Sequence, residues 1–405
     1  MSSAGKTLLV ISQVYAPDPA AVGQQVTDAA EEMVRRGWRV VVYTSARGYD
    51  DPRNRYPRRE RRNGVEVRRL PLSSFGKRSI AIRLVAQCLF MIQAVGRGLW
   101  TGDLGLVLVS TSPPFAGLGG SIVSFLRRVP LVWWVMDLNP DQMIVAGKIG
   151  PRSVFARVFD WINRVTLRQA RDVVVLDRFM RDRVLAKLPV TEKIHVIPPW
   201  PHDDHLASLP SRPNAFRTAH GLEDDFIVMY SGNHALQHPL DTVLDAAHQM
   251  EDEPSLRFVF VGGGAGKAAV EARIAAGASN VVSLPYQPLE RIGESLSAAD
   301  IHIVTMGDDM VGIVHPCKIY GALAVGRPIV FLGPRLSHAG EILGDRSFAS
   351  CVNHGDPQAV VDAIRRFRTI NEVLRDRLGE EAVTLASEGY SRRLLMSLFC
   401  AVLSP

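Results

Sequence analysis

The stretch 306–330 reads MGDDMVGIVHPCKIYGALAVGRPIV, and it predicts the fold of the chain around it. One short apolar run, 301–304, precedes its turn and another, 329–332, closes it, as is typical of buried parallel strands. Between the two runs a helical pattern extends over 316–325, and Gly326 fits its C-terminal cap. The stretch therefore predicts a strand, a turn, a helix and a second parallel strand.

The turn before this helix carries groups that can bind an anion. The first amides of a helix have no internal partners and carry partial positive charge, and at the carboxyl end of a parallel strand they usually face a phosphate. We expect these amides to come from Gly312, Ile313 and Val314, and Lys318 adds a full charge one turn into the helix. A crossover whose polar residues are only solvated fits the same spacing, so both interpretations stay open.

The same stretch resembles the donor-binding segment of the GT-B glycosyltransferases of family 4. In that family P-S-K-[LIV]-Y-E leads into a helix that ends A-A-G-[KR]-P-[VI]. Here the two parts read PCKIYG at 316–321 and AVGRPI at 324–329.

The resemblance departs from the family at its pair of acids, E-x7-E. The two positions fall near Ile313 and on Gly321, and neither residue is acidic. Asp308 and Asp309 lie a few residues upstream and can replace the first acid only. Asp309 and Lys318 are therefore the candidate catalytic residues of this half of the chain.

Composition predicts an ordinary globular chain of two or three domains. It has 405 residues, of which 47% are hydrophobic and 22% charged, with a net charge of +6. Four scattered cysteines indicate a reducing cytoplasm, with neither a disulfide framework nor a zinc motif, and no signal peptide is expected. No apolar run reaches the roughly 18–20 residues that cross a bilayer, since the nearest, 84–95, lies between Arg83 and Arg97.

Alternating strand and helix patterns divide the chain into two α/β halves. The halves 1–200 and 215–387 are joined by a proline-rich linker, 201–214, and a last helix occupies 388–405. The resemblance implies the GT-B fold: two Rossmann-like domains whose parallel sheets face each other across a cleft, with the acceptor in the first, the donor in the second, and the last helix crossing back. The His-Asp-Asp-His sequence at 202–205 suggests a metal site, but a linker does not preorganise ligands, so no metal is expected.

Two residues of the first half are candidates for ligand contacts. Gly23 precedes the first helix and resembles the glycine loop that lies over the donor phosphates in GT-B enzymes, although glycine before a helix is common. Asp137 follows the apolar run 130–136, and such strand ends are where α/β sheets bind ligands. Asp137 is the candidate acceptor-orienting group or general base, and a helix-capping aspartate is the alternative.

An arginine-rich segment, 49–69, accounts for much of the positive charge, and a strand is expected over 65–70. It is interpreted either as a solvated surface loop or as a contact with an anionic membrane or a phosphorylated acceptor. The helix that follows, 79–99, is either a core helix or a helix resting on the membrane. No interleaved aromatic and basic pattern is present, so nucleic acid is not expected. The arginines assigned to the acceptor or membrane are Arg58, Arg59, Arg61 and Arg62.

The second half holds the remaining candidates for donor binding. After the strand 226–231, the resemblance places Asn233 and His238 where the family has an Arg and a Lys that hold the donor diphosphate. Protonation of His238, which a nearby diphosphate favours, restores the missing charge; ordinary loop histidines are the alternative. The other residues assigned to the donor site are Gly232, Gly263, Tyr286, Gln287 and Glu341.

The resemblance implies a glycosyltransferase that moves a sugar from a nucleotide-sugar donor to a glycan or lipid-linked acceptor in cell-surface polysaccharide biosynthesis. It also implies retention at the anomeric carbon without a metal, and no cofactor is expected. The cysteines favour a cytoplasmic enzyme, and the arginine-rich segment with the helix after it suggests peripheral contact with the inner face of the membrane. Two other classes stay open. One is an epimerase of the GT-B fold that acts on nucleotide sugars, and the other is a catalytically inactive, donor-binding partner protein, which the missing acid at Gly321 favours.

Overall fold

A computed structural model describes residues 5–18, 20–48, 53–73, 80–201, 206 and 209–404. The chain divides into two compact units, which are described separately. Unit 1 is Met1–Pro199 with Leu395–Pro405, and unit 2 is Trp200–Leu394. Each unit is an α/β layer structure around a parallel sheet, which confirms the predicted fold class. The His-Asp-Asp-His sequence at 202–205 lies outside the described residues.

Unit 1 contains an eight-stranded sheet in the order β3-β4-β2-β1-β5-β6-β7-β8. All neighbours are parallel except β3, which is antiparallel to β4. The central strands are buried on both faces, so they read as continuous apolar runs. The strands are β1 (Thr7–Ile11), β2 (Arg39–Ser45), β3 (Arg59–Arg62), β4 (Val65–Leu70), β5 (Leu104–Val109), β6 (Leu131–Trp134), β7 (Asp172–Val175) and β8 (Ile194–Val196).

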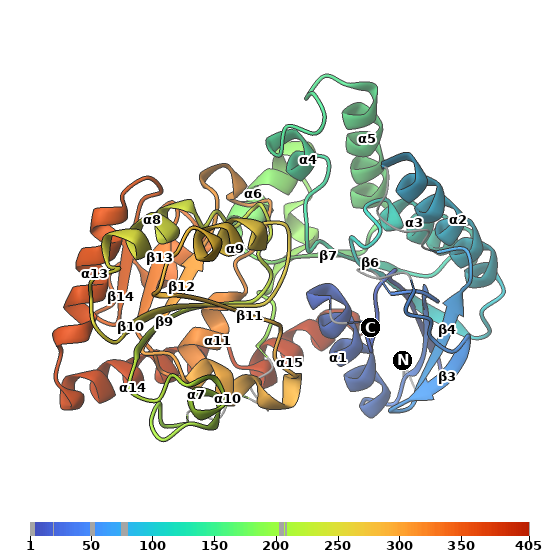
Figure 1. Cartoon of the computed structure of the whole chain (residues 1–405). Helices are drawn as coiled ribbons and strands as arrows, with labels where there is room; N and C mark the ends of the chain where they lie inside the picture. Colours follow the sequence, from blue (N-terminus) through green and yellow to red (C-terminus); the bar gives the residue numbers. More distant parts are fainter. Residues whose placement is uncertain are drawn as a thin grey trace. The chain divides into compact units, whose positions relative to one another are not determined.

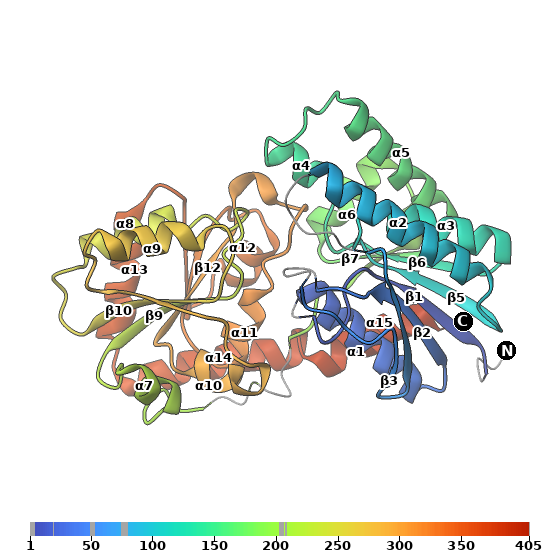
Figure 2. The same cartoon turned by 45° about the vertical axis from the view of Figure 1, so that its right-hand side comes forward.

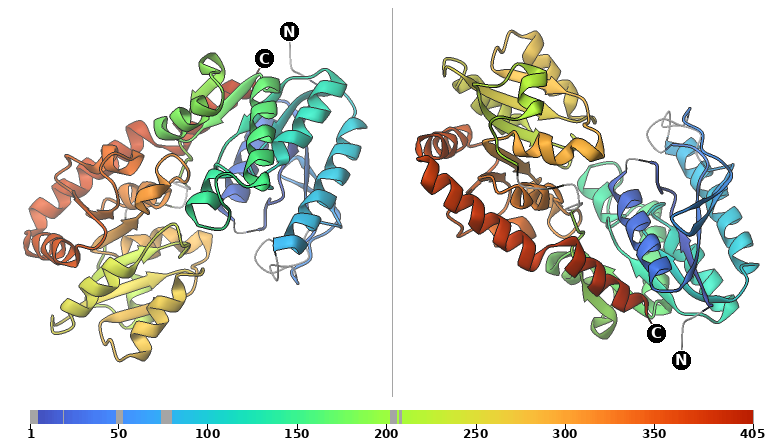
Figure 3. Two further views of the ribbon diagram at one scale, coloured as in Figure 1. Left: turned by 90° about the horizontal axis from the view of Figure 1, so that it is seen from above. Right: turned by 90° about the horizontal axis from the view of Figure 1, so that it is seen from below.

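Helices cover both faces of this sheet. The helices α2, α3 and α5 lie together on one face, and α1 and α15 lie on the other (Figures 1 and 2). The helix α15, red in Figure 3, follows α14 along the chain and ends in unit 1, where the Phe399 ring lies 4.1 Å from the Trp134 ring. The helices of unit 1 are α1 (Ala21–Arg35), α2 (Ile80–Leu99), α3 (Ala116–Arg127), α4 (Asp141–Val145), α5 (Val154–Gln169), α6 (Arg178–Lys187) and α15 (Arg392–Leu403).

The glycines of α3 let its neighbours approach closely. A Cβ on Gly117 would lie 2.6 Å from the Thr166 hydroxyl of α5, and a Cβ on Gly119 would collide with Met91 of α2. Larger residues at these two positions would push the three helices apart. The layer α2–α3–α5 therefore depends on small residues in its central helix.

The arginine-rich segment contains a hairpin: β4 matches the strand expected over 65–70, and β3 corrects the prediction of a loop before it. β3 contains Arg59, Arg61 and Arg62, follows Arg58, and pairs with β4 through a turn at Asn63–Gly64 with φ values of 46° and 84°. An Asn-Gly pair between two strands is the usual signal for such a turn, and the signal was present in the sequence. All four arginines are exposed at a sheet edge, where charge also prevents unwanted pairing with another chain.

The helix α2 corrects the expectation that no stretch is long enough to cross a membrane. Its segment Ile82–Leu99 has a mean hydropathy of 1.3, so by length and composition it is long and apolar enough to cross a membrane. Its apolar residues outweigh the two arginines inside it. The same helix connects β4 to β5 of one sheet, and Phe90 and Ala94 are fully buried against the unit. The criterion is weak evidence for a span, since helices of a folded core also meet it.

Unit 2 contains a six-stranded parallel sheet in the order β11-β10-β9-β12-β13-β14. Its strands are β9 (Phe226–Ser231), β10 (Leu256–Val261), β11 (Val281–Leu284), β12 (Ile301–Thr305), β13 (Ile329–Leu332) and β14 (Ala349–Val352). Its helices are α7 (Ala215–His220), α8 (Asp241–Gln249), α9 (Lys267–Ala275), α10 (Ile292–Ser297), α11 (Lys318–Ala324), α12 (His338–Leu343), α13 (Pro357–Thr369) and α14 (Glu372–Gly389). The predicted helix 316–325 is thus shorter at both ends.

A buried ion pair connects the segments that precede β9 and β12. The Nη2 atom of Arg217 donates to Oδ2 of Asp300 at 2.6 Å, and both side chains are fully buried. The same carboxylate oxygen accepts the amide of Ile227 at 2.8 Å. Two further N–H groups of the guanidinium donate to the carbonyls of Ala298 and Leu222, at 2.9 and 3.2 Å. One arginine therefore ties α7 to both central strands of the sheet.

Replacing Asp300 with alanine should strongly destabilise unit 2. Arg217 would remain buried without its carboxylate, and breaking such a pair on one side costs about 3–5 kcal/mol. In Asp300→Ala, we expect the backbone amides of β9 and β12 to exchange with solvent deuterium faster than in the wild type. The increase in exchange rate should correspond to the loss of about 3–5 kcal/mol of stability. Asp245→Ala is the control, because its pair with Arg273 is largely exposed and contributes about 0–1 kcal/mol. Similar exchange in the two variants would contradict this assignment.

Candidate active site

The strand order of unit 2 reverses between β9 and β12, and this reversal marks a ligand-binding edge. The connection after β9 leads to β10 on one side, and the connection after β12 leads to β13 on the other. In open parallel sheets, ligands bind outside the carboxyl ends of the two strands at such a reversal. Gly232 follows β9 at this edge, and Met306 follows β12.

Lys318, the first residue of α11, extends to this edge. Its ammonium lies 5.1 Å from the centre of the Tyr230 ring, and a Cβ on Gly232 would lie 2.7 Å from its Cε. Glycine at 232 therefore makes room for the lysine, and its φ of 130° also favours glycine. No carboxylate of the described residues pairs with Lys318, and burial lowers its pKa to about 8. A desolvated cation without a carboxylate is a preformed site for an anion.

Two loops of this edge are held together by backbone hydrogen bonds. The amide of His234 donates to the Gly263 carbonyl, and the amide of Gly266 donates to the His234 carbonyl, each at 2.7 Å. A side chain at Gly264 would collide with Asn233 and with the His234 backbone. Burial, with a smaller effect from the charge of Lys318, lowers the pKa of His234 to about 4. His234 is therefore neutral at pH 7 and packs between the loops, and Asn233 lies exposed beside it.

His238 is neutral in this structure, and its protonation beside a bound diphosphate stays a prediction. Its Nδ1 atom lies 2.6 Å from the Thr305 carbonyl, so Nδ1 carries the proton and donates. Burial lowers the pKa of His238 to about 3, and the charge of Lys318 adds to this effect. One desolvated cation already occupies the edge, and a second one beside it is unfavourable.

The amides expected to bind an anion are partly used inside the turn. The amides of Ile313 and Val314 donate to the Met310 carbonyl at 3.0 and 3.2 Å, so these two are not unpartnered helix amides. The expectation is wrong for them because the chain closes a tight turn, with Gly312 at a φ of 71°, before α11 begins at Lys318. The positive charge of this edge therefore comes from the lysine and not from a row of free amides.

The acids near this turn do not pair with the lysine. Asp308 and Asp309 lie in the short 3-10 helix η4 (Asp308–Met310), and both are exposed. At the other family position, a Cβ on Gly321 would lie 3.1 Å from Cδ1 of Leu296. A glutamate at 321 would thus start against a largely buried leucine, and the catalytic role of Asp309 stays a prediction.

Tyr286 and Gln287 lie near the end of β11, where they adjoin Gly263. The Tyr286 hydroxyl donates to the Gly263 carbonyl at 3.1 Å, and a Cβ on Gly263 would lie 3.2 Å from the Tyr286 ring. Gln287 donates to the Pro285 carbonyl at 3.1 Å. The exposed aromatic ring resting on a glycine can pack against a flat ligand group.

A hydrogen-bonded cluster at the start of α11 was missed from the sequence. The Tyr320 hydroxyl lies 2.7 Å from Nε2 of His315 and 2.9 Å from Nε2 of His338. Tyr320 has one proton to donate, so one histidine accepts from it and the other donates to it. The Tyr390 ring lies 5.2 Å from the Tyr320 ring, and Glu341 is exposed on α12 one turn after Ser337. The histidines and tyrosines are far apart in sequence, so only the spacing of His315 and Tyr320 gave a local signal.

In unit 1, Asp137 follows β6 at the carboxyl edge of the sheet. Its amide and that of Met136 donate to the Thr111 hydroxyl, at 3.1 and 3.3 Å, and Thr111 follows the neighbouring strand β5. No ion pair involves Asp137 within the described chain, and burial raises its pKa to about 6. The group is a carboxylate at pH 7 that can accept a proton, as a general base requires.

Gly23 lies inside α1 and not before it, which corrects its predicted position. A Cβ on this residue would lie 3.3 Å from the Tyr15 amide and 3.4 Å from the Val14 backbone. Glycine at this position allows α1 to approach the loop after β1 closely. Its contact with donor phosphates stays a prediction. No group of three His, Cys, Asp or Glu side chains able to hold a metal occurs among the described residues.

Replacing Asp137 with asparagine should stabilise unit 1 at high pH. Burial disfavours the carboxylate, so the pKa of Asp137 is about 6 in the folded protein and about 4 in the unfolded chain. The contribution of this group to the free energy of unfolding is complete below about pH 4 and is lost as the pH rises through about 6. We expect Asp137→Asn to exceed the wild type by on the order of 2 kcal/mol at about pH 8, and to match it near pH 4. Urea unfolding at the two pH values measures this, with the exposed Glu192→Gln as control. A difference that does not change with pH would contradict the assignment.

Comparisons with known proteins agree with this architecture. The family descriptions "Glycosyl transferase 4-like domain" and "Glycosyl transferases group 1" match residues 20–200 and 225–369. A putative colanic acid biosynthesis glycosyl transferase, WcaI of Escherichia coli (strain K12), is 26% identical over 379 residues, which cover 89% of this chain and 91% of that one. A probable glycosyltransferase, WbjE of Pseudomonas aeruginosa, is 22% identical over 320 residues, or 78% of each chain.

Solved structures show the same fold at low sequence identity. Sucrose-phosphate synthase (tll1590) from Thermosynechococcus elongatus has a TM-score of 0.76 and 16% identity, with 98% of each chain covered. Anabaena Alr3699/HepE in complex with UDP and glucose has a TM-score of 0.74 and 16% identity, with 98% of each chain covered. With family matches across both of its units, the chain belongs to the family-4-like glycosyltransferases of the GT-B fold.

Proposed function

We propose that this glycosyltransferase binds a nucleotide-sugar donor through unit 2 and transfers the sugar, with retention and without a metal, to a glycan or lipid-linked acceptor in polysaccharide biosynthesis. The name of the Escherichia coli relative, which refers to colanic acid biosynthesis, supports the polysaccharide pathway. The HepE structures hold UDP or UDP-glucose, which supports a nucleotide-sugar donor.

The observation that carries this proposal is the half-buried Lys318, which pairs with no carboxylate in the described part of the chain. It lies at the strand reversal, against Gly232, where an α/β sheet binds its ligand. The terminal phosphate of a nucleoside diphosphate gains negative charge as it departs, and a preorganised cation in a desolvated place stabilises that charge. His234 and His238 are neutral, and the nearby Lys267 donates to the carbonyls of Gly262 and Leu284 at 2.9 and 3.2 Å, so Lys318 is the proposed anion-binding cation.

The two units supply different parts of the proposed reaction. In unit 2 the bond between the anomeric carbon and the diphosphate oxygen breaks, the diphosphate keeps the electron pair, and the Lys318 ammonium stabilises the negative charge that develops on it. An acceptor hydroxyl oxygen bonds to the anomeric carbon and gives up its proton to a base. In unit 1 Asp137 is the proposed acceptor-orienting group or base, because its carboxylate takes up a proton near pH 6. Asp309 is exposed on η4 and is proposed to contact the donor sugar.

Binding of a nucleoside diphosphate should weaken as the pH rises above about 8. An anion beside Lys318 raises its pKa, so the complex holds a proton that the free protein releases above pH 8. Affinity then falls by up to about tenfold per pH unit. Calorimetric titration with uridine, guanosine and adenosine diphosphates measures the affinity and the proton uptake.

Lys318→Met is the matched variant for this titration. We expect it to bind on the order of a hundredfold more weakly and to lose the pH dependence above pH 8. Lys193→Met is the control, because this lysine of unit 1 already donates to the carbonyls of Arg168 and Ala170. An unchanged affinity in Lys318→Met would remove Lys318 from the donor site.

A second experiment separates the transferase from the two other classes. The donor that binds is incubated with the full chain and a bacterial lipid extract, and proton NMR follows the anomeric signal with and without a chelator. We expect the sugar to be transferred with the anomeric configuration of the donor retained, and we expect the chelator to have no effect. Inversion would overturn retention, an epimerised sugar without acceptor would indicate the epimerase, and binding without transfer or hydrolysis would indicate the inactive partner.

A further inference from the structure

The outer surface of α2 and α3 is apolar where a surface helix normally is polar. Their inner sides pack on the sheet, and α3 lies between α2 and α5 (Figure 2). We define the α2–α3 face by its exposed large apolar side chains. These are Val85, Ile92, Trp100, Ile122, Phe125 and Leu126.

Several of these side chains are largely exposed. Ile92 is 68% exposed and Phe125 69%, and Trp100, directly after α2, is 90% exposed. A large exposed apolar surface is typical of an interaction site. The α2–α3 face is therefore a candidate interaction surface.

The charge on this face has one sign. Between residues 80 and 136 the sequence contains four arginines and one acid, Asp103. Three of the arginines, Arg97, Arg127 and Arg128, gather where α2 and α3 end, because Nη1 of Arg127 donates to the carbonyls of Leu99 and Thr101 at 2.6 and 2.8 Å. The cationic group thus adjoins Trp100, and tryptophan beside basic residues is typical of protein surfaces at a membrane interface.

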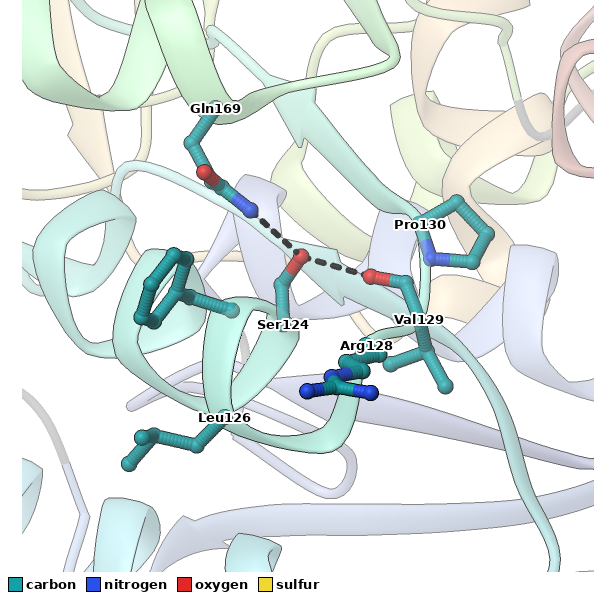
Figure 4. A pocket seen from close by; sticks show the side chains of 7 residues that line it. Ser124, Leu126, Arg128, Val129, Pro130 and Gln169 are labelled. Carbon is teal, nitrogen blue, oxygen red and sulfur yellow. Dashed lines mark hydrogen bonds between the residues drawn. The ribbon is translucent and has the colours of Figure 1, made fainter.

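The end of α3 is also hollowed. An open depression of about 620 Å³ lies there, lined by apolar side chains together with the polar Ser124 and Gln169 and the charged Arg128 (Figure 4). Its inner wall is fixed by hydrogen bonds from Gln169 to the Ser124 hydroxyl, at 3.3 Å, and from that hydroxyl to the Val129 carbonyl, at 2.6 Å. An anionic headgroup beside Arg128 with apolar atoms against Leu126 matches this chemistry.

We propose that the α2–α3 face binds the surface of a bilayer that contains anionic lipid. Apolar side chains enter the headgroup region, the arginines contact lipid phosphates, and α2 lies along the surface, because both its ends are connected to strands of one sheet. A second copy of this chain is a poorer partner, since its arginines would face those of the first. The proposal moves the membrane contact from the arginines of β3 to this helical face, and it does not depend on the donor assignment.

The test is flotation of the full chain with vesicles of phosphatidylcholine alone and of phosphatidylcholine mixed with phosphatidylglycerol. We expect binding to the mixed vesicles only, weakened by high salt. The variant Ile92→Glu with Phe125→Glu should bind more than about thirtyfold more weakly, because it adds repulsion from anionic lipid and removes apolar contacts. Val373→Glu is the control, since Val373 is 80% exposed on α14 of unit 2, and it should bind like the wild type.

A milder variant separates charge from folding defects. Arg97→Ala with Arg128→Ala keeps the apolar side chains and should weaken binding to mixed vesicles by about thirtyfold, at an unchanged melting temperature. No binding of the wild type to mixed vesicles, or equal binding of both double variants and the wild type, would overturn the proposal. Sedimentation without lipid tests a second copy of the chain as the partner. If the wild type is a dimer and Ile92→Glu is a monomer, the face joins two copies, and the lipid proposal is overturned.

Discussion

The placement of one ammonium group governs the ligand-binding edge of unit 2. Lys318 has lost much of its water and has no carboxylate partner in the described chain, so its pKa falls to about 8 and it still carries its charge at pH 7. The surroundings follow from that charge: Gly232 leaves space for the side chain, and His234 and His238 stay neutral beside it. A desolvated cation beside neutral histidines can stabilise a bound anion electrostatically.

The scaffold keeps this cation in place through contacts that begin at the opposite end of the sheet. Arg217 and Asp300 tie together the segments before β9 and β12, next to the point where the two strands pair. Tyr320 links two histidines across the start of α11 and thereby fixes the helix on which Lys318 lies. The absent family acid has a packing reason in this chain, because position 321 faces Leu296. Glycine there keeps α11 close to α10.

The carboxyl edge of the sheet of unit 1 and the helices that cover this sheet differ in their chemical character. Its carboxyl edge holds Asp137, whose burial prepares it to exchange a proton near neutral pH. Its outer helical layer is apolar and cationic, and the glycines of α3 hold that layer together. A lipid-linked acceptor needs both properties, since its sugar must reach a base while its lipid stays in the membrane. The arginines of β3, by contrast, lie on an edge strand, where charge has a structural use of its own.

The sequence by itself determined the alternation of strands and helices, because buried parallel strands and helix ends leave local patterns, and its family motifs indicated the GT-B architecture. The Asn63–Gly64 hairpin was readable from the sequence but overlooked. The charge state of His238, the internal bonding of Ile313 and Val314, and the bridge at Tyr320 were decided only by the tertiary structure. Desolvation and hydrogen-bond partners come from residues distant in sequence, and no local pattern specifies them.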